Sequence, residues 1–413
     1  MSLFAISWSY IKEKPLNTFL NTLLLSLGIG IIVVLLLMSH QVQSNLEKNA
    51  KGIDLVVGAK GSPLQLILSS IYHIDFPTGN IPLIEAQKIA ANRRMVEKAI
   101  PLALGDSYRE FRIVGTNQLY RDVYSAEIES GAFWQDDLEV TIGANVAKTL
   151  GFEIGDEFQG EHGLTSNGHS HDEHNYKIVG ILKQSNSVLD NLILTNVESV
   201  WVMHEKEGSE DHHGSDKLEP DIFGIKIGDQ GEDKELTSLL IKYRSPRAAM
   251  QFPRMVNNNS SLQAASPPFE TARLFNLIGA GVEIIRGFAY LIIVIAGLSV
   301  FIALYNSLKD RKYDLAIMRS MGASRTRIMS LILIEGMIIT AIGGIMGFVL
   351  GHGVVELLGQ LMATANQNIV TGQLFLSNEW LVALMSLVLG IFVSIIPAVE
   401  AYKTDISEVL ANG

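Results

Sequence analysis

Residues 309–327, KDRKYDLAIMRSMGASRTR, form a short basic segment between two long apolar runs. Its basic residues are Lys309, Arg311, Lys312, Arg319, Arg325 and Arg327. A loop this short and positive between two membrane spans is expected on the cytoplasmic side. Its apolar positions favour a short helix with one apolar side, which Gly322 would end: Tyr313, Leu315, Ile317, Met318 and Met321. The segment therefore predicts a rigid cytoplasmic element held between two spans.

The composition points to a membrane protein. Of the 413 residues, 48% are hydrophobic and 18% charged, which is too apolar for a disordered chain and indicates membrane segments. The chain has no cysteine, so disulfides and thiolate chemistry are excluded.

Four apolar runs are long enough to cross about 30 Å of hydrocarbon. We expect spans at residues 19–40, 284–308, 328–358 and 380–399. An amphipathic helix at 1–18, with its aromatic side chains at headgroup level, would precede the first span. The tail at 400–413 would return to the cytoplasm, so both termini are expected inside. A cleaved signal peptide is the alternative for the first span, but the apolar run is too long and no small-residue cleavage site follows.

The mixed, turn-rich segment 41–283 predicts one large α+β domain. Lys12 and Lys14 precede the first span, which places this domain outside the cytoplasm, and a loop at 359–379 on the same side. This domain has 22 basic and 34 acidic residues, a net charge of −12 against −11 for the whole chain, so we expect no nucleic-acid partner. Helices are predicted at 63–72, 84–99, 146–150, 234–243 and 272–287, and strands at 111–114, 139–142, 176–182, 192–194 and 222–227.

The chain lacks the motifs of an ATPase or a hydrolase. The nearest match to a phosphate-binding loop is GANVAKT at 143–149, where Ala147 stands in place of the glycine that admits the phosphate. We find no serine nucleophile motif and no H-E-x-x-H zinc motif. We therefore expect no enzymatic activity in this chain and no directly bound cofactor.

Two features of the third span could serve helix association or ionic chemistry. Gly343, Gly347 and Gly351 recur at steps of four, which lets another helix approach closely. That helix could belong to the same chain or to a second copy, and the sequence leaves both open. Glu335 is expected to pair with a nearby arginine or with the interface, and a proton relay is the alternative.

Histidines gather between residues 162 and 213. His169, His171 and His174 stand in HSHDEH, and a second group contains His204, His212 and His213. Imidazole and carboxylate groups in a loop suit Zn²⁺, Ni²⁺ or Cu²⁺. A solvated acidic loop with incidental histidines is the alternative to a metal site.

The basic segment resembles the FtsX/MacB-like permeases, which are transmembrane subunits of type VII ABC transporters and include the lipoprotein-releasing permeases. The resemblance rests on RKYDLAIMRSMGAS at 311–324 and LIEG at 333–336, with Asp314 and Ser320 as mild departures. The exit motif PAVEAYK at 397–403 and SEVL at 407–410 agree, although Ser407 replaces the usual proline. In the outer domain, IGANVA at 142–147 and IVGIL at 178–182 are similar to the MacB-like periplasmic core.

The resemblance implies a mechanism and partners. Such permeases work in the bacterial inner membrane as homodimers or with a related permease, and a separate ATPase subunit binds the ATP. Their short cytoplasmic coupling helix docks on that ATPase, and the docking residues here would be Asp314, Leu315, Met318, Arg319, Met321 and Gly322. The motion would act on a lipoprotein, a peptide or a metal-bearing protein outside the cytoplasm, with a periplasmic adaptor as a further partner. Alternatives are a regulator that switches a cell-wall hydrolase, and zinc-linked transport or sensing.

Overall fold

The computed structural model of the chain describes residues 3–162, 175–204, 221–225, 234–364 and 370–403. The chain divides into two compact units. The helical unit comprises Met1–Val42, Ile278–Thr364 and Asn368–Gly413, and the sheet unit comprises Gln43–Leu277 and Ala365–Gln367. Two long helices, α2 and α9, contribute residues to both units.

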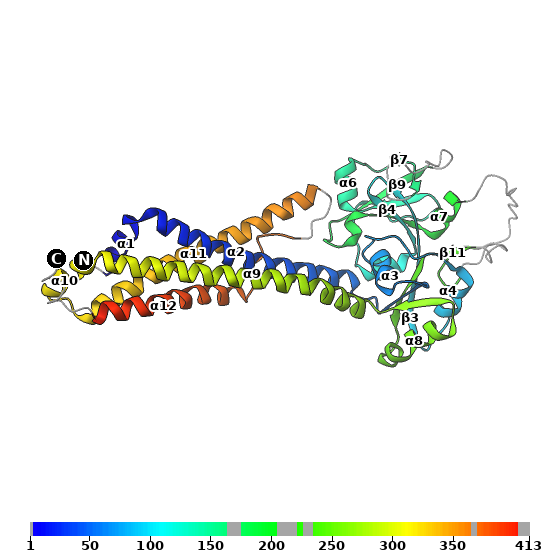
Figure 1. Ribbon diagram of the computed structural model, residues 1–413. Coiled ribbons are helices and arrows are strands. Elements are labelled where there is room, and N and C mark those ends of the chain that lie inside the picture. Colours follow the sequence, from blue (N-terminus) through cyan, green and yellow to red (C-terminus); the bar gives the residue numbers. More distant parts are fainter. Residues whose placement is uncertain (1–2, 163–174, 205–220, 226–233, 365–369, 404–413) are drawn as a thin grey trace, which may run out of the picture. The chain divides into compact units, whose positions relative to one another are not determined.

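Long apolar helices build the helical unit (Figure 1). Its elements are α1 (Leu3–Glu13), α2 (Pro15–Ala50), α9 (Pro267–Asp310), α10 (Lys312–Ser320), α11 (Arg325–Thr364) and α12 (Glu379–Lys403). Among the described residues, four of these are long and apolar enough to cross a membrane, namely α2, α9, α11 and α12. These are the four spans that the sequence predicts.

Helix α2 packs against α11 along a row of small residues. The predicted glycines lie on this face: Gly343 lies against Leu25, Gly347 against Ile29 and Gly351 against Val33. A Cβ atom on Gly347 would lie 2.7 Å from the Cβ atom of Ile29, so only glycine permits this approach. Helices in lipid gain their association from such close backbone contact. The structure thus uses these glycines for packing within one chain.

The sheet unit is built on one large mixed sheet. The strand order is β13-β1-β12-β3-β4-β10-β6-β9-β5, with β7 paired to β9 and β8 to β3. The strands are β1 (Leu55–Ala59), β3 (Val96–Tyr108), β4 (Phe111–Thr116), β5 (Ile128–Gly131), β6 (Glu139–Ile142), β7 (Glu157–Phe158), β8 (Glu161–His162), β9 (Tyr176–Leu182), β10 (Leu192–Asn196), β12 (Ser238–Tyr243) and β13 (Leu262–Ala265). A separate pair joins β2 (Ile81–Pro82) to β11 (Glu235–Leu236).

Short helices cover both faces of this sheet (Figure 1). They are α3 (Pro63–Ser70), α4 (Leu83–Ala90), α5 (Gln118–Val123), α6 (Ala144–Leu150), η1 (Val188–Asn191), α7 (Val197–His204) and α8 (Pro246–Asn259). Along β12, Leu239 and Ile241 enter the core beneath α4, α7 and α8. Leu240, between them, enters the core beneath α3 and α5. Alternate side chains of the central strands are therefore buried on opposite faces.

Several predictions for this unit are confirmed and three are wrong. The helices at Pro63 and before Gly151 are present, and so are the strands that begin at Phe111, Glu139, Tyr176 and Leu192. The predicted helix 234–243 is instead strands β11 and β12, because a strand buried on both faces is a continuous apolar run without period-two alternation. The predicted helix 84–99 ends at Ala90, and β3 begins at Val96. The strand predicted at 222–227 is a turn over its described part, 222–225, where the Asp221 carboxylate accepts from the amides of Phe223 and Ile225.

We predict that Gly347→Val lowers the thermal stability of the purified protein, whereas Gly353→Val does not. Both changes add the same side chain to the same helix, but no described atom lies within 4 Å of a Cβ atom on Gly353. Overpacking of this kind costs about 1–3 kcal/mol. Thermal unfolding in detergent, followed by tryptophan fluorescence, measures both variants. Equal midpoints for the two would contradict the close approach of α2 and α11.

A second prediction concerns acid stability of the sheet unit. Burial lowers the pKa of His73 to about 3, while its Nε2 atom lies 3.0 Å from the Tyr120 hydroxyl. The unfolded chain binds a proton at His73 below about pH 6.5, so the folded state loses stability as pH falls from there towards 3. The loss amounts to about 3 kcal/mol at pH 4.

His73→Asn removes this titration and suits the backbone, since His73 has a φ of 56° and asparagine tolerates the left-handed region. Between pH 7 and pH 4, we expect the unfolding midpoint of the variant to fall less than that of the unmodified chain. Parallel pH profiles would show that His73 does not titrate on unfolding.

Candidate functional site

Helix α10 lies at one end of the helical unit, between α9 and α11 (Figure 1). Arg311 separates α9 from α10, and its carbonyl oxygen accepts the first α10 bond, from the Leu315 amide at 3.1 Å. Gly322, with a φ of 99°, follows the end of the helix, which confirms the predicted stop. Helix α10 is thus a rigid element with a fixed beginning and end.

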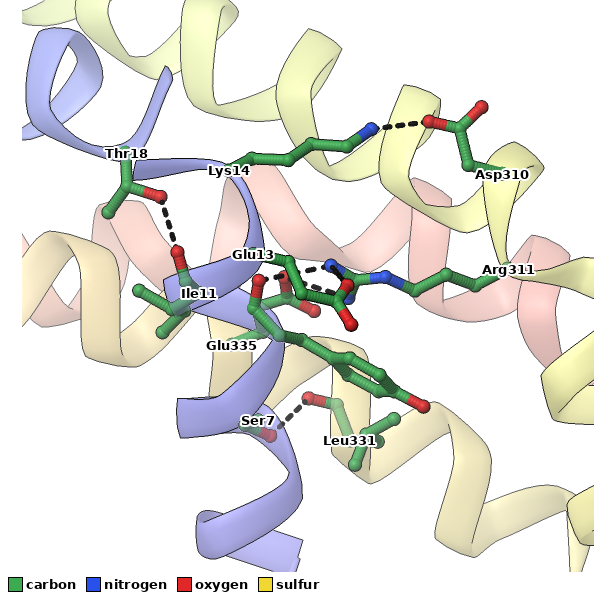
Figure 2. Close-up of polar contacts among 10 residues, drawn as sticks. Ser7, Ile11, Glu13, Lys14, Thr18, Asp310, Arg311, Leu331 and Glu335 are labelled. Atoms are coloured by element: carbon green, nitrogen blue, oxygen red, sulfur yellow. Dashed lines mark hydrogen bonds and ion pairs between the residues drawn. The ribbon is translucent and has the colours of Figure 1, made fainter. Parts of the chain in front are cut away.

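The Arg311 side chain joins α10 to α1 and α11 (Figure 2). Its guanidinium donates to the carbonyl oxygen of Tyr10 at 3.0 Å and lies 3.9 Å from the centre of the Tyr10 ring. The same group lies 3.1 Å from a carboxylate oxygen of Glu13 and 3.6 Å from one of Glu335. One planar, five-donor cation therefore connects three helices, an arrangement that lysine could not reproduce.

The Arg311–Glu335 pair is buried, with 9% and 6% of the two side chains exposed. This confirms the expectation that Glu335 pairs with an arginine. The second carboxylate oxygen of Glu335 has no hydrogen-bond partner among the described residues. A buried ion pair contributes little net stability when intact, but losing one partner leaves an uncompensated charge. The pair therefore fixes position more than it adds stability.

Further contacts fasten α1 and the start of α2 to the same end (Figure 2). Lys14 forms an ion pair with Asp310, the last residue of α9. The buried Ser7 hydroxyl donates to the Leu331 carbonyl oxygen at 3.2 Å. The Thr18 hydroxyl donates to the Ile11 carbonyl oxygen at 3.1 Å. Exposed Phe4 and Trp8 leave α1 with an apolar outer side, as an interfacial helix would have.

The structure divides the predicted docking residues between the surface and the interior. Leu315 is 3% exposed and packs with Leu308, Ile328 and Ala401, and Met318 is half-buried against this cluster. Asp314, Met321 and Gly322 are exposed, and Arg319 is half-buried and has a polar contact. The exposed apolar side chains of this segment are Tyr313 (50%), Ile317 (38%) and Met321 (82%). These three residues, the last of which caps the end of α10, therefore form the exposed apolar part of its outer face.

The sheet unit holds the last two turns of α2. The Lys48 ammonium donates to the carbonyl oxygens of Ser185 and Asn186, at 2.8 and 3.1 Å. The side-chain oxygen of Asn49 accepts from the Val188 amide at 3.1 Å, and the backbone carbonyl oxygen of Asn49 accepts from the Tyr124 hydroxyl at 3.0 Å. The buried carboxylate of Asp190 accepts from the amides of Ser185 and Asn186, which fixes this loop. These hydrogen bonds anchor the end of α2 in the sheet unit.

An apolar groove opens along α2, α9 and α12 within the helical unit. Its volume is about 570 Å³, and most of its lining is aliphatic, including Ile29, Leu36, Leu381 and Leu389. Arg286 and Asn378 supply polar groups. Such a groove can accommodate hydrocarbon chains.

The predicted metal ligands His169, His171 and His174 lie outside the described residues, as do His212 and His213. Within the described part of the chain, no group of three histidine, aspartate or glutamate residues could hold a metal ion.

The fold is that of a membrane protein, in which one chain combines candidate spanning helices with a large sheet domain. The family model of the MacB-like periplasmic core domain matches residues 18–245, and that of the FtsX-like permease C-terminal region matches residues 286–406. The chain therefore belongs to the family of ABC transporter permeases with a MacB-like periplasmic core and an FtsX-like C-terminal region. This confirms the predicted family and the predicted fold class.

Two relatives illustrate the similarity. The uncharacterized ABC transporter permease YknZ of Bacillus subtilis is 25% identical over 40% of this chain and 41% of its own length. The lipoprotein-releasing system transmembrane protein LolC of Neisseria meningitidis is 21% identical over 98% of both chains. The crystal structure of the periplasmic region of MacB from Actinobacillus actinomycetemcomitans covers 56% of this chain and 98% of its own, at 10% identity and a TM-score of 0.34.

Sequence reasoning missed the organising role of Arg311, which it counted only as one positive charge of the loop. Spacing does not show that Tyr10, Glu13 and Glu335 meet this side chain, because they come from the beginning of the chain and from a later helix. The available signal was the lone acid of the third span, which requires a cationic partner.

We predict that Arg311→Met destabilises the protein by about 3–5 kcal/mol, because Glu335 then stays buried without its partner. Adding Glu335→Gln to this variant should recover part of the loss, since the uncompensated charge is removed. Arg327→Met, at an exposed position in the first turn of α11, is the matched control. Chemical unfolding in detergent micelles measures all three. Equal stability of the Arg311 and Arg327 variants would show that the buried pair does not fix α10.

Proposed function

We propose that this chain is the transmembrane subunit that passes ATP-driven motion from a separate ATPase to its own sheet unit. In this proposal the chain lies in a bacterial inner membrane, with both termini and α10 in the cytoplasm and the sheet unit on the other side. The observation that carries the proposal is α10 itself: a short helix with an exposed apolar face, fastened at its start to α1 and α11 by Arg311.

The exposed face of α10 would be the ATPase-docking surface. Tyr313, Ile317 and Met321 present apolar surface to the cytoplasm, and Asp314 adds a charge beside them. Leu315 lies on the opposite, buried side of α10 and holds the helix against the bundle. Because Arg311 joins the start of α10 to α1 and α11, a force on α10 would act on the bundle and not on one loop.

Helix α2 would carry this motion onward. Near its start, Lys14 pairs with the end of α9. At its other end, Lys48 and Asn49 are bonded to the loop around Asp190 in the sheet unit. The proposal requires two arrangements of the helices in equilibrium. A ligand can shift that equilibrium only by binding one arrangement more tightly than the other, and ATP bound to the partner ATPase would do so. A second copy or a related permease would complete the assembly.

A lipoprotein is the first substrate to test. The similarity to LolC extends over 98% of both chains, and that relative is a lipoprotein-releasing system protein. The apolar groove along α2, α9 and α12 would suit the acyl chains of such a substrate.

The docking face can be tested on the full chain, purified with its associated proteins from its native host. We expect Ile317→Glu with Met321→Glu to reduce the co-purifying, vanadate-sensitive ATP hydrolysis by at least about tenfold, since placing two charges in an apolar contact costs more than the 1.4 kcal/mol that corresponds to that factor. Membrane insertion and thermal stability should be unchanged, because both side chains are exposed.

Thr326→Glu is the matched control, since it adds a charge at an exposed position close in sequence to α10 but in the first turn of α11. It should retain the ATPase activity. Equal ATP hydrolysis in the double variant and this control would exclude the outer face of α10 as the docking surface.

A further inference from the structure

A segment at the end of the helical unit remote from α10, residues 370–378, is bonded to three helices. Gln41 of α2 donates to the Thr371 carbonyl oxygen at 2.9 Å and accepts from its amide at 2.8 Å. Glu356 of α11 accepts from the Gly372 amide at 2.9 Å and from the Thr371 hydroxyl at 3.0 Å. The segment, here called the clamp segment, therefore ties α2 to α11.

His352 and Glu379 hold the clamp segment from beneath. The Nδ1 atom of His352 lies 2.6 Å from the Gly372 carbonyl oxygen, and Nε2 lies 3.3 Å from an Oε atom of Glu379. The other Glu379 oxygen accepts from the Leu376 amide at 3.2 Å. Only 13% of the His352 side chain and 5% of the Glu379 side chain are exposed, and the imidazole stacks on Phe375. The pair is thus enclosed.

The hydrogen bonds of this pair require a proton. A carbonyl oxygen only accepts, so the contact with Gly372 is a hydrogen bond when Nδ1 carries the hydrogen. In a neutral imidazole, Nε2 then holds a lone pair, which would face the carboxylate oxygen of an ionised Glu379. Two acceptors facing each other in a buried site are unfavourable. The contact becomes favourable only when one proton lies between them, either on Nε2 or on the Glu379 carboxyl.

We propose that His352 and Glu379 form a proton-binding site whose occupancy fastens the clamp segment, and through Thr371 the helix α2, to α11 and α12. The proposal rests on these contacts alone and does not depend on the proposed docking of an ATPase. With the proton bound, His352 holds Gly372 in place. When the proton leaves, repulsion between Nε2 and the carboxylate loosens Gly372 and the bonds of Thr371 to Gln41.

The other groups around this pair do not offer an alternative binding site for the proton. From α11, the other titratable group is Glu356, whose bonds to Gly372 and Thr371 are those of an ionised acceptor. From α2 the facing residue is the uncharged Gln41, and the clamp segment contributes the uncharged Gln373. From α9, Arg286 lines the groove beside Asn378 and is paired with Glu283. Glu379 is therefore the carboxylate that shares a proton with His352.

A nitroxide label tests the site in the full chain, reconstituted in lipid nanodiscs. The chain has no cysteine, so Leu374→Cys, at a partly exposed position of the clamp segment, labels it uniquely. Electron paramagnetic resonance between pH 5 and pH 10 should show an immobile label at low pH and a mobile one at high pH. For a single proton, the ratio of the two populations changes by up to about tenfold per pH unit.

Glu379→Gln is the decisive variant. Its amide supplies a hydrogen to Nε2 without any titration, so the label should stay immobile throughout the pH range. His352→Leu should leave the label mobile at every pH. Glu356→Gln should raise the mobility but keep the pH dependence.

A label at Val349→Cys, on the exposed face of α11, should not respond to pH. A pH-independent spectrum in the unmodified background would overturn the proposal. So would a transition that persists in the Glu379→Gln protein, because another group would then be responsible.

Discussion

The guanidinium of Arg311 lies among a ring, a carbonyl oxygen and two carboxylates at the junction of α9 and α10. A charged group costs free energy in an apolar bundle unless it is paired, and Glu335 is buried in the same place. The two residues therefore constrain each other, and the contact fixes where α10 begins. The packing of Leu315 on Ile328 and Ala401 then orients the helix and leaves Tyr313, Ile317 and Met321 on its outer face.

Helix α2 is constrained in a different way along each part of its length. In the helical unit it lies close to α11 because Gly343, Gly347 and Gly351 have no side chains. Its last residues belong to the sheet unit, where the loop around Asp190 bonds Lys48 and Asn49. In the proposed function, α2 is the element that transmits movement to the sheet unit.

The ion pairs described in the helical unit gather at its two ends. Arg311 and Glu335 lie at the end that contains α10, and His352 and Glu379 lie at the other, beneath the clamp segment. Between them, α2 meets α11 through Leu25, Ile29 and Val33 against glycines, and these contacts do not specify a single register by charge. The ionic groups at the ends supply that specificity, because burying any of them without its partner is costly.

The sequence by itself determined the four spans, the basic segment with its short helix, and the family, because long apolar runs, clustered charge and motifs are local properties of the chain. It also indicated that Glu335 pairs with a nearby arginine or lies at the membrane interface. The prediction failed where the local pattern is ambiguous. The sequence of β12 was predicted to be helical because both faces of this strand are buried, so apolar and polar residues do not alternate along it. Only the tertiary structure decided that Arg311 is the partner of Glu335, that the glycines serve contacts within the chain, and that Leu315 lies inside. These are contacts between residues distant in sequence, and no local pattern encodes which side chains meet.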